Sequence, residues 1–229
     1  MIGNDARLFA AHSDVLSLSP FFAALIRNQF YEAGPSKRIE LPDEEPEVFS
    51  AILEYLYKGD YYPRLVHEPN KLKRDSWSLE DALSTAGDTM KPLPNTPSAT
   101  TTSSTFYHNG VQGILLKDTA VHCAAERYGL NDLQRISLRK QGLRTGIPVD
   151  VILRSARYAY EQTPEQDAKL RAHFLALIIR SRKTFKRSGT MQMEMEAGGS
   201  KLFFDLFVAM CNHIDDITEL TNKGSPKTV

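Results

Sequence analysis

The stretch from Pro92 to Ser104 constrains the fold more than any other feature of the sequence. It consists almost wholly of Pro, Ser, Thr, Ala and Asn, so it has almost no side chain that could bury apolar area. Without such burial, the entropy lost on ordering a chain is not offset. We therefore expect a disordered insertion at about 61–113, with the folded core built from the segments on either side. In its flanks, Trp77, Leu79 and Leu83 could form a short helix.

The segment before the insertion alternates strand and helix signals. Arg7–Ala11, which follows a Gly-Asn-Asp turn, and Lys37–Leu41, which alternates polar and apolar residues, predict short strands. Between them, Ser19 and Pro20 place an N-cap before a favoured first helical residue. A clearer helix opens at Pro46 and is closed by Gly59, and its continuous apolar stripe predicts core positions at Val48, Phe49, Ile52, Leu53 and Leu56.

The segment after the insertion is predicted to be helical. The sequence Thr-Pro-Glu-Gln at 163–166 resembles a capping box with proline at the first helical position, which predicts a helix beginning at Pro164. The expected elements are helices at Leu115–Tyr128, at 131–141, around 149–156 and from 164, a loop at 188–200, and a last helix at 202–217.

Charge and cysteine usage narrow the classes of function. Twenty-eight basic residues balance 28 acidic ones, so no overall field attracts nucleic acid or an anionic membrane. There are only two cysteines, no signal peptide is visible, and the longest apolar stretch, Phe174–Ile179, is too short to cross a bilayer. We expect a cytoplasmic or nuclear protein, or one found in both, with protein partners and with no direct nucleic-acid or membrane contact.

Residues that could carry catalysis or metal binding are sparse. Neither His122 with Cys123 nor Cys211 with His213 has the four-ligand spacing of a structural zinc site. We expect no catalytic residue, cofactor or metal; the alternative is a Cys–His pair that meets only in the fold. Glu44 and its neighbour sit at a helix start, where they complement the macrodipole.

A basic cluster follows at Arg180–Arg187. It fits solvated cations at a helix end better than a nuclear-import signal.

Three stretches of the chain carry a more specific pattern. The first is Ala-His-Ser-Asp-Val-Leu-Ser-Leu-Ser-Pro-Phe-Phe at 11–22. The second is Ile-Glu-Leu-Pro-Asp at 39–43, continued by Pro-Glu-Val-Phe at 46–49 and Leu-Glu-Tyr-Leu-Tyr-Lys-Gly at 53–59. The third is Ala-Ala-Glu-Arg-Tyr-Gly-Leu-Asn-Asp-Leu at 124–133. Together, and in this order, the three stretches resemble the BTB/POZ family in its filamentous-fungal form.

The resemblance implies an α+β architecture. We expect a BTB/POZ domain at 1–143, in which a helical cluster is capped by a small three-stranded-type sheet. An α-helical extension at 144–220, similar by position to that of ubiquitin-ligase adaptors, and a flexible tail at 221–229 would follow. In the family, a first strand precedes the position of Gly3, and the zinc-finger relatives add a swapped segment at the N-terminus. This sequence begins at Met1, so we do not expect strand-exchanged dimers.

One motif that the resemblance implies is sharper. Cullin-binding members carry an apolar residue, any residue and then Glu before the third strand, and Phe30, Tyr31 and Glu32 fit this pattern. Phe30 would anchor in a partner's pocket and Glu32 would fix the register. The alternative is that Phe30 packs on its own core and Glu32 is solvated.

Two functions stay open at this point. The leading hypothesis is a non-catalytic substrate adaptor for a cullin-type ubiquitin ligase. The alternative is a self-associating scaffold, for example a homodimer, or a transcriptional regulator without cullin binding.

Overall fold

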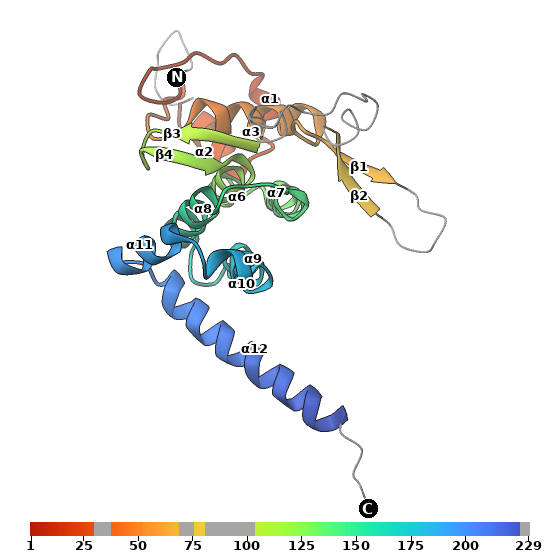
Figure 1. Ribbon diagram of the computed structural model, residues 1–229. Coiled ribbons are helices and arrows are strands. Elements are labelled where there is room, and N and C mark those ends of the chain that lie inside the picture. The colour runs from red at the N-terminus through yellow and green to blue at the C-terminus, as the bar shows by residue number, and fades with distance from the viewer. Residues whose placement is uncertain (30–37, 69–75, 81–103, 225–229) are drawn as a thin grey trace, which may run out of the picture.

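The protein combines a helical body with two small antiparallel hairpins, as the computed structural model shows for residues 1–29, 38–68, 76–80 and 104–224 (Figure 1). An α+β architecture is therefore observed. In chain order the elements are α1 (Ser13–Leu16), α2 (Pro20–Gln29), α3 (Pro46–Lys58), β1 (Leu65–Glu68), β2 (Ser76–Leu79), β3 (Thr105–His108), β4 (Gly113–Leu116), α6 (Lys117–Arg127), α7 (Asn131–Leu143), α8 (Val149–Gln162), α9 (Lys169–Arg180), α10 (Arg182–Phe185), α11 (Gly189–Ala197) and α12 (Leu202–Gly224).

Helix α3 forms as its sequence predicts. Pro46 occupies the first helical position, and the left-handed backbone of Gly59, with φ of 75°, ends the helix while its N–H bonds to the Tyr55 carbonyl. All five side chains of the predicted stripe are buried: Val48, Phe49, Ile52, Leu53 and Leu56. This stripe joins the main hydrophobic core.

The small sheet expected near the N-terminus is reduced to two isolated bridges. Ile2 pairs antiparallel with Arg7 and parallel with Leu41. The prediction of a strand over 7–11 was wrong, because the chain leaves its partner after one residue and Phe9 turns onto the ring of Phe49 at 5.2 Å. The strand predicted over 37–41 is likewise limited, within the described residues, to Leu41.

Two hairpins occupy the flanks of the predicted insertion. In the first, β1 pairs with β2, so Trp77 and Leu79 lie in a strand and the short helix predicted there was wrong. Trp77 contacts His67 across the strands, and the Arg139 guanidinium of α7 lies 4.8 Å from its ring. Leu83, the third residue of that expected helix, lies outside the described residues. The centre of the insertion does too, so its expected disorder stays a prediction.

The second hairpin corrects the start of the next helix. Strands β3 and β4 pair antiparallel across a four-residue loop at 109–112, so Leu115 belongs to a strand and α6 begins only at Lys117. The Gln112 N–H donates to the Asn109 carbonyl at 3.2 Å within this loop. Both Leu115 and Leu116 are buried in the core.

Two expectations for the C-terminal half were also wrong. The hydroxyl of Thr163 donates to the Ala159 carbonyl at 2.7 Å, so it serves the end of α8, and the next helix begins at Lys169 instead of Pro164. The expected loop at 188–200 contains helix α11. An ion pair of 2.6 Å between Glu194 and Arg157 holds α11 against α8.

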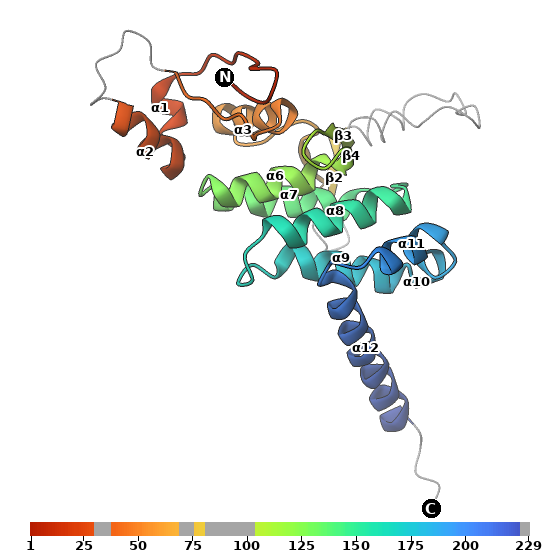
Figure 2. The same ribbon diagram turned by 90° about the vertical axis from the view of Figure 1, so that its left-hand side faces the viewer.

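One hydrophobic core runs through both the predicted domain and its predicted extension. The buried cluster extends from Ile2 to Leu206, and α8 packs on β4, α6 and α9 (Figure 2). The Leu116 N–H donates to the hydroxyl of Ser155 at 2.9 Å, directly across the expected boundary. The division at 143 stays a prediction, and the described core is not interrupted there.

Helix α12 is longer than predicted and leaves the body. Its first turns are anchored by Leu202 and Leu206, both buried, and α12 then projects away from the other helices in both views (Figures 1 and 2). Residues 221–224 of the expected tail continue this helix, and 225–229 lie outside the described residues.

Candidate functional site

The predicted partner-binding residues, Phe30 and Glu32, lie outside the described residues, so their role stays a prediction. The structure does describe the elements on both sides. Helix α2 is fixed by the buried side chains of Phe22 and Ile26, while Arg27 near its end is exposed. The chain therefore enters the motif from an exposed helix end.

The start of α2 is held by a contact between two of the family-like stretches. The hydroxyl of Ser19 donates to the Tyr128 carbonyl at 2.7 Å and accepts the Phe22 N–H at 3.4 Å. The ring of Tyr128 lies 4.8 Å from that of Phe22, measured between centroids. Gly129 ends α6 with φ of 69°, and a Cβ on it would lie 3.2 Å from the ring of Pro20. The stretches at 11–22 and 124–133 thus meet in space.

The acidic pair before α3 has a larger role than its position at the helix start indicated. Glu44 bonds to the guanidinium of Arg127 at 2.9 Å and accepts a short hydrogen bond from the Tyr128 hydroxyl. Glu45 accepts bonds from the backbone and side-chain nitrogens of Asn109, at 2.7 and 3.0 Å. Burial, together with the Glu44 charge, raises the pKa of Tyr128 well above its usual range. The pair therefore joins the start of α3 to the end of α6 and to the second hairpin.

A second buried network ties the end of α3 to α6 and α7. The ammonium of Lys140, which is fully buried, lies 2.5 Å from a carboxylate oxygen of Asp60 and 3.5 Å from the centroid of the Tyr61 ring. The Tyr61 hydroxyl donates to Asp118 at 2.7 Å, and Arg144 donates to the other Asp118 oxygen at 2.8 Å. Burial lowers the pKa of Lys140, opposed by Asp60, and raises that of Tyr61. These groups hold the fold together and have no open face toward a substrate.

The surface of the N-terminal helices offers apolar contact area. Leu8, Leu18 and Tyr57 are exposed, and His12 holds the Tyr57 hydroxyl through its backbone N–H at 2.9 Å and its ring nitrogen at 2.7 Å. A shallow hollow of about 400 Å³ lies between Phe21, the 40–44 segment and the Arg127–Tyr128 pair. Apolar side chains held in place on a surface suit contact with another protein.

The first His–Cys pair considered for catalysis, His122 with Cys123, does not form an accessible reactive group. Cys123 is fully buried, and burial raises the pKa of its thiol to about 12. His122 lies 3.4 Å from an Asp167 oxygen and 3.4 Å from the Ser137 hydroxyl. That row resembles a nucleophile, base and acid, but Ser137 is fully buried inside α7 and donates to the Gln134 carbonyl at 3.0 Å.

The described part of the chain also lacks a metal cluster and a membrane span. Among the described residues, no group of three or more His, Cys, Asp and Glu side chains could hold a metal ion. Within the same ranges, no helix has the length and apolar character needed to cross a bilayer.

Comparison with known proteins identifies the class of the N-terminal part. The family model described as BTB/POZ domain matches residues 1–71, which include α1, α2, α3 and β1. No curated protein and no solved structure matches the chain. The chain thus carries a BTB/POZ domain, a module that mediates protein–protein interaction and dimerisation. Such modules are generally non-enzymatic.

Proposed function

We propose that the protein is a substrate adaptor for a cullin-type ubiquitin ligase, working in the cytoplasm, the nucleus or both. The observation that carries the proposal is the BTB/POZ match over residues 1–71, with Phe30 and Glu32 inside it directly after α2. In this role the Phe30 ring anchors in an apolar pocket of the cullin and Glu32 fixes the register of the contact.

The described residues on both sides of the motif are anchored to the body, which supports the proposal. Before the motif, α2 is fixed through Ser19 and Phe22 to the end of α6. After it, the Leu41 N–H donates to the Met1 carbonyl at 2.9 Å, and the Gly3 N–H donates to the Leu41 carbonyl at 3.0 Å. Anchored elements on both sides reduce the entropy lost when such a segment is ordered by a partner.

The helical extension supports an adaptor because it is joined rigidly to the N-terminal part. Ser155 of α8 bonds to the backbone of β4, and Tyr158 lies 5.1 Å from His108, measured between ring centroids. A target bound on the extension would therefore keep a fixed orientation toward a cullin bound near α2.

The alternative function is a self-associating scaffold or a transcriptional regulator that binds no cullin. The BTB/POZ match favours it equally, because these domains also dimerise. It differs in needing no exposed role for Phe30.

The test is capture of the purified chain by an immobilised cullin N-terminal domain. The double variant Phe30→Ala with Glu32→Ala should lose capture, since truncating an interface anchor commonly costs about 2 kcal/mol or more. The matched control is Phe204→Ala with Glu161→Ala, an exposed Phe and an exposed Glu of the C-terminal helices, which should bind as wild type does.

Thermal melts of each variant separate binding from folding. If Phe30 packs on its own core, the double variant will melt well below wild type and lose capture only because it unfolds. If the wild-type chain captures no cullin, the adaptor proposal fails and the scaffold takes its place.

A further inference from the structure

Helix α12 presents an exposed apolar stripe on its projecting part. Phe203, Phe207, Met210, Ile214 and Ile217 follow one another at alternating steps of four and three residues, the spacing that two paired helices require. We call these five residues the α12 seam. The last four are exposed by 67%, 40%, 58% and 45%. An isolated helix gains little stability in water, so such a stripe calls for a covering partner.

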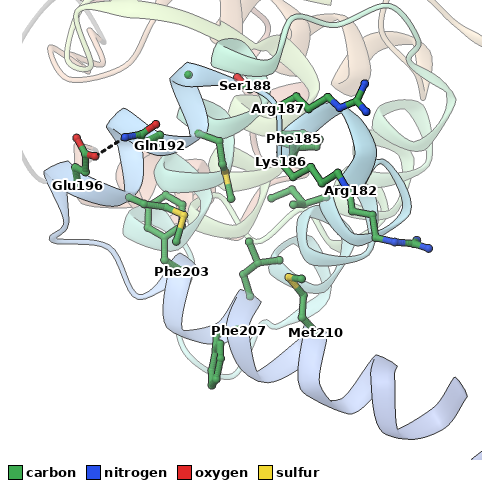
Figure 3. A pocket seen from close by; sticks show the side chains of 15 residues that line it. Arg182, Phe185, Lys186, Arg187, Ser188, Gln192, Glu196, Phe203, Phe207 and Met210 are labelled. Carbon is green, nitrogen blue, oxygen red and sulfur yellow. Dashed lines mark hydrogen bonds between the residues drawn. The ribbon is translucent and has the colours of Figure 1, made fainter. Parts of the chain in front are cut away.

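The first half of the seam borders an apolar groove. The groove has a volume of about 660 Å³ and lies between α12 and the α10–α11 segment, with Phe185, Met191 and Phe203 among its lining residues. Three exposed basic residues, Arg182, Lys186 and Arg187, also line it, and Figure 3 shows them on the α10–α11 side of the groove, across from Phe207 and Met210 of α12.

The charges of the projecting half of α12 are of the opposite sign. Asp215, Asp216 and Glu219 are exposed there, and none of them is a seam position. The helical positions that flank the seam in this half, Cys211, His213, Thr218 and Leu220, carry no acidic side chain. The acidic residues therefore lie on the outer side of a helix paired through its seam.

We propose that two copies of this chain pair antiparallel through α12, each laying the acidic half of its helix along the basic groove of the other. The register is symmetric about Asn212. It sets Phe207 of one copy opposite Ile217 of the other and Met210 opposite Ile214, so large apolar side chains meet over these four seam positions, while Phe203 faces Thr221. A two-fold pairing of this kind makes the same contacts twice and closes on itself.

The antiparallel direction follows from the charges. In this direction Asp215, Asp216 and Glu219 approach Arg182, Lys186 and Arg187 of the other copy. In a parallel pair the acidic half of each helix would lie beyond the groove of the other copy, so both basic grooves would stay without acidic neighbours. A different protein could cover the seam, but the chain itself already supplies both complementary surfaces.

The first experiment measures self-association of the full chain by sedimentation equilibrium. Ile214→Lys should raise the Kd for self-association about tenfold or more, because it places an ammonium in the centre of the seam. The matched control is Ile114→Lys, the same change at an exposed isoleucine of β4 that belongs neither to the seam nor to the groove, and it should leave the Kd within about twofold of wild type. Both positions are exposed, so circular-dichroism melts should show a fold as stable as wild type.

The second experiment tests the direction by charge reversal. One variant carries Asp215→Lys, Asp216→Lys and Glu219→Lys, and the other carries Arg182→Glu, Lys186→Glu and Arg187→Glu. Each alone should associate weakly, and an equimolar mixture should form heterodimers, because both of its contacts again join opposite charges.

The outcomes decide the proposal in both directions. The proposal is supported if Ile214→Lys weakens self-association and if mixing the two charge-reversal variants restores association. A wild-type chain that stays monomeric overturns it and leaves the seam to a different partner. It is also overturned if Ile214→Lys associates as wild type does, which would place self-association in the BTB/POZ domain alone, or if the mixed variants associate no better than each alone.

Discussion

The buried pair of Lys140 and Asp60 predicts an asymmetric response to mutation. The Lys140 side chain is fully buried, whereas that of Asp60 is 21% exposed and also accepts the backbone N–H groups of Tyr61 at 2.7 Å and Leu65 at 2.9 Å. Asp60→Asn removes the negative charge beside the buried ammonium and leaves it neutral close partners, namely the Tyr61 carbonyl and ring and the new amide oxygen. An uncompensated buried charge of this kind costs about 3–5 kcal/mol of unfolding free energy.

Removing the cation should cost much less. Lys140→Met keeps most of the side-chain volume and leaves Asp60 partly solvated and bonded to two N–H groups, so we expect a loss of about 0–2 kcal/mol. The double variant should be close to Lys140→Met, because the charge that Asp60→Asn leaves unpaired is then absent.

The measurement is urea denaturation of the three variants at neutral and alkaline pH. In the folded state burial lowers the pKa of Lys140 below its usual 10.5, so the cost of burying the ammonium is fully present at neutral pH and is relieved as pH rises through the lowered pKa. Losing Asp60 lowers that pKa further, so the deficit of Asp60→Asn should shrink toward about pH 9.5, still below the usual tyrosine pKa. Equal losses for the two single variants, or a deficit independent of pH, would refute this reasoning.

Three further predictions concern the hydrophobic core, two glycines with positive φ and the two cysteine thiols. Phe49→Ala should lower the unfolding free energy by about 3–5 kcal/mol in chemical denaturation, since the ring is buried, and an unchanged midpoint would contradict the α3 assignment. Alanine at Gly146, where a Cβ meets open space, should cost about 1–2 kcal/mol through its positive φ. The same change at Gly129 should cost more, because the Cβ there contacts the proline ring that begins α2, and equal melting temperatures would exclude that contact. A maleimide should label exposed Cys211 in the native chain and reach Cys123 only after unfolding, so two labels on the folded protein would contradict the burial.

The helices that could be predicted from the sequence carry their own local signals. The start of α2 at Pro20 and both ends of α3 coincide with capping residues, and the α3 stripe recurs with helical period. Thr163 lies between the end of α8 and the start of the next helix. The sequence pattern predicted that it caps the next helix, whereas its hydroxyl bonds to the Ala159 carbonyl at the end of α8. The Asn-Gly pair at 109–110 is a general turn signal, and it lies inside the four-residue loop that joins β3 to β4, at the edge of a polar insertion.

The contacts around the candidate site depend on residues far apart in the chain. Nothing local to Glu44 shows that it meets Arg127 and Tyr128, and nothing near Lys140 shows that it reaches Asp60. The exposure of the α12 seam depends on how little of the helix the body covers, which no local pattern around these residues shows.

The core shared between the N-terminal part and the later helices has an evolutionary consequence. A domain that encloses its own core can be recombined with new neighbours by gene fusion. Here Leu116 and Ser155 form a hydrogen bond across the expected boundary, and α8 covers β4 and α6. Exchanging the extension would therefore expose apolar side chains of β4 and α6 to solvent. The two parts are therefore expected to be inherited as one unit, with substitutions in α8 matched by substitutions in β4.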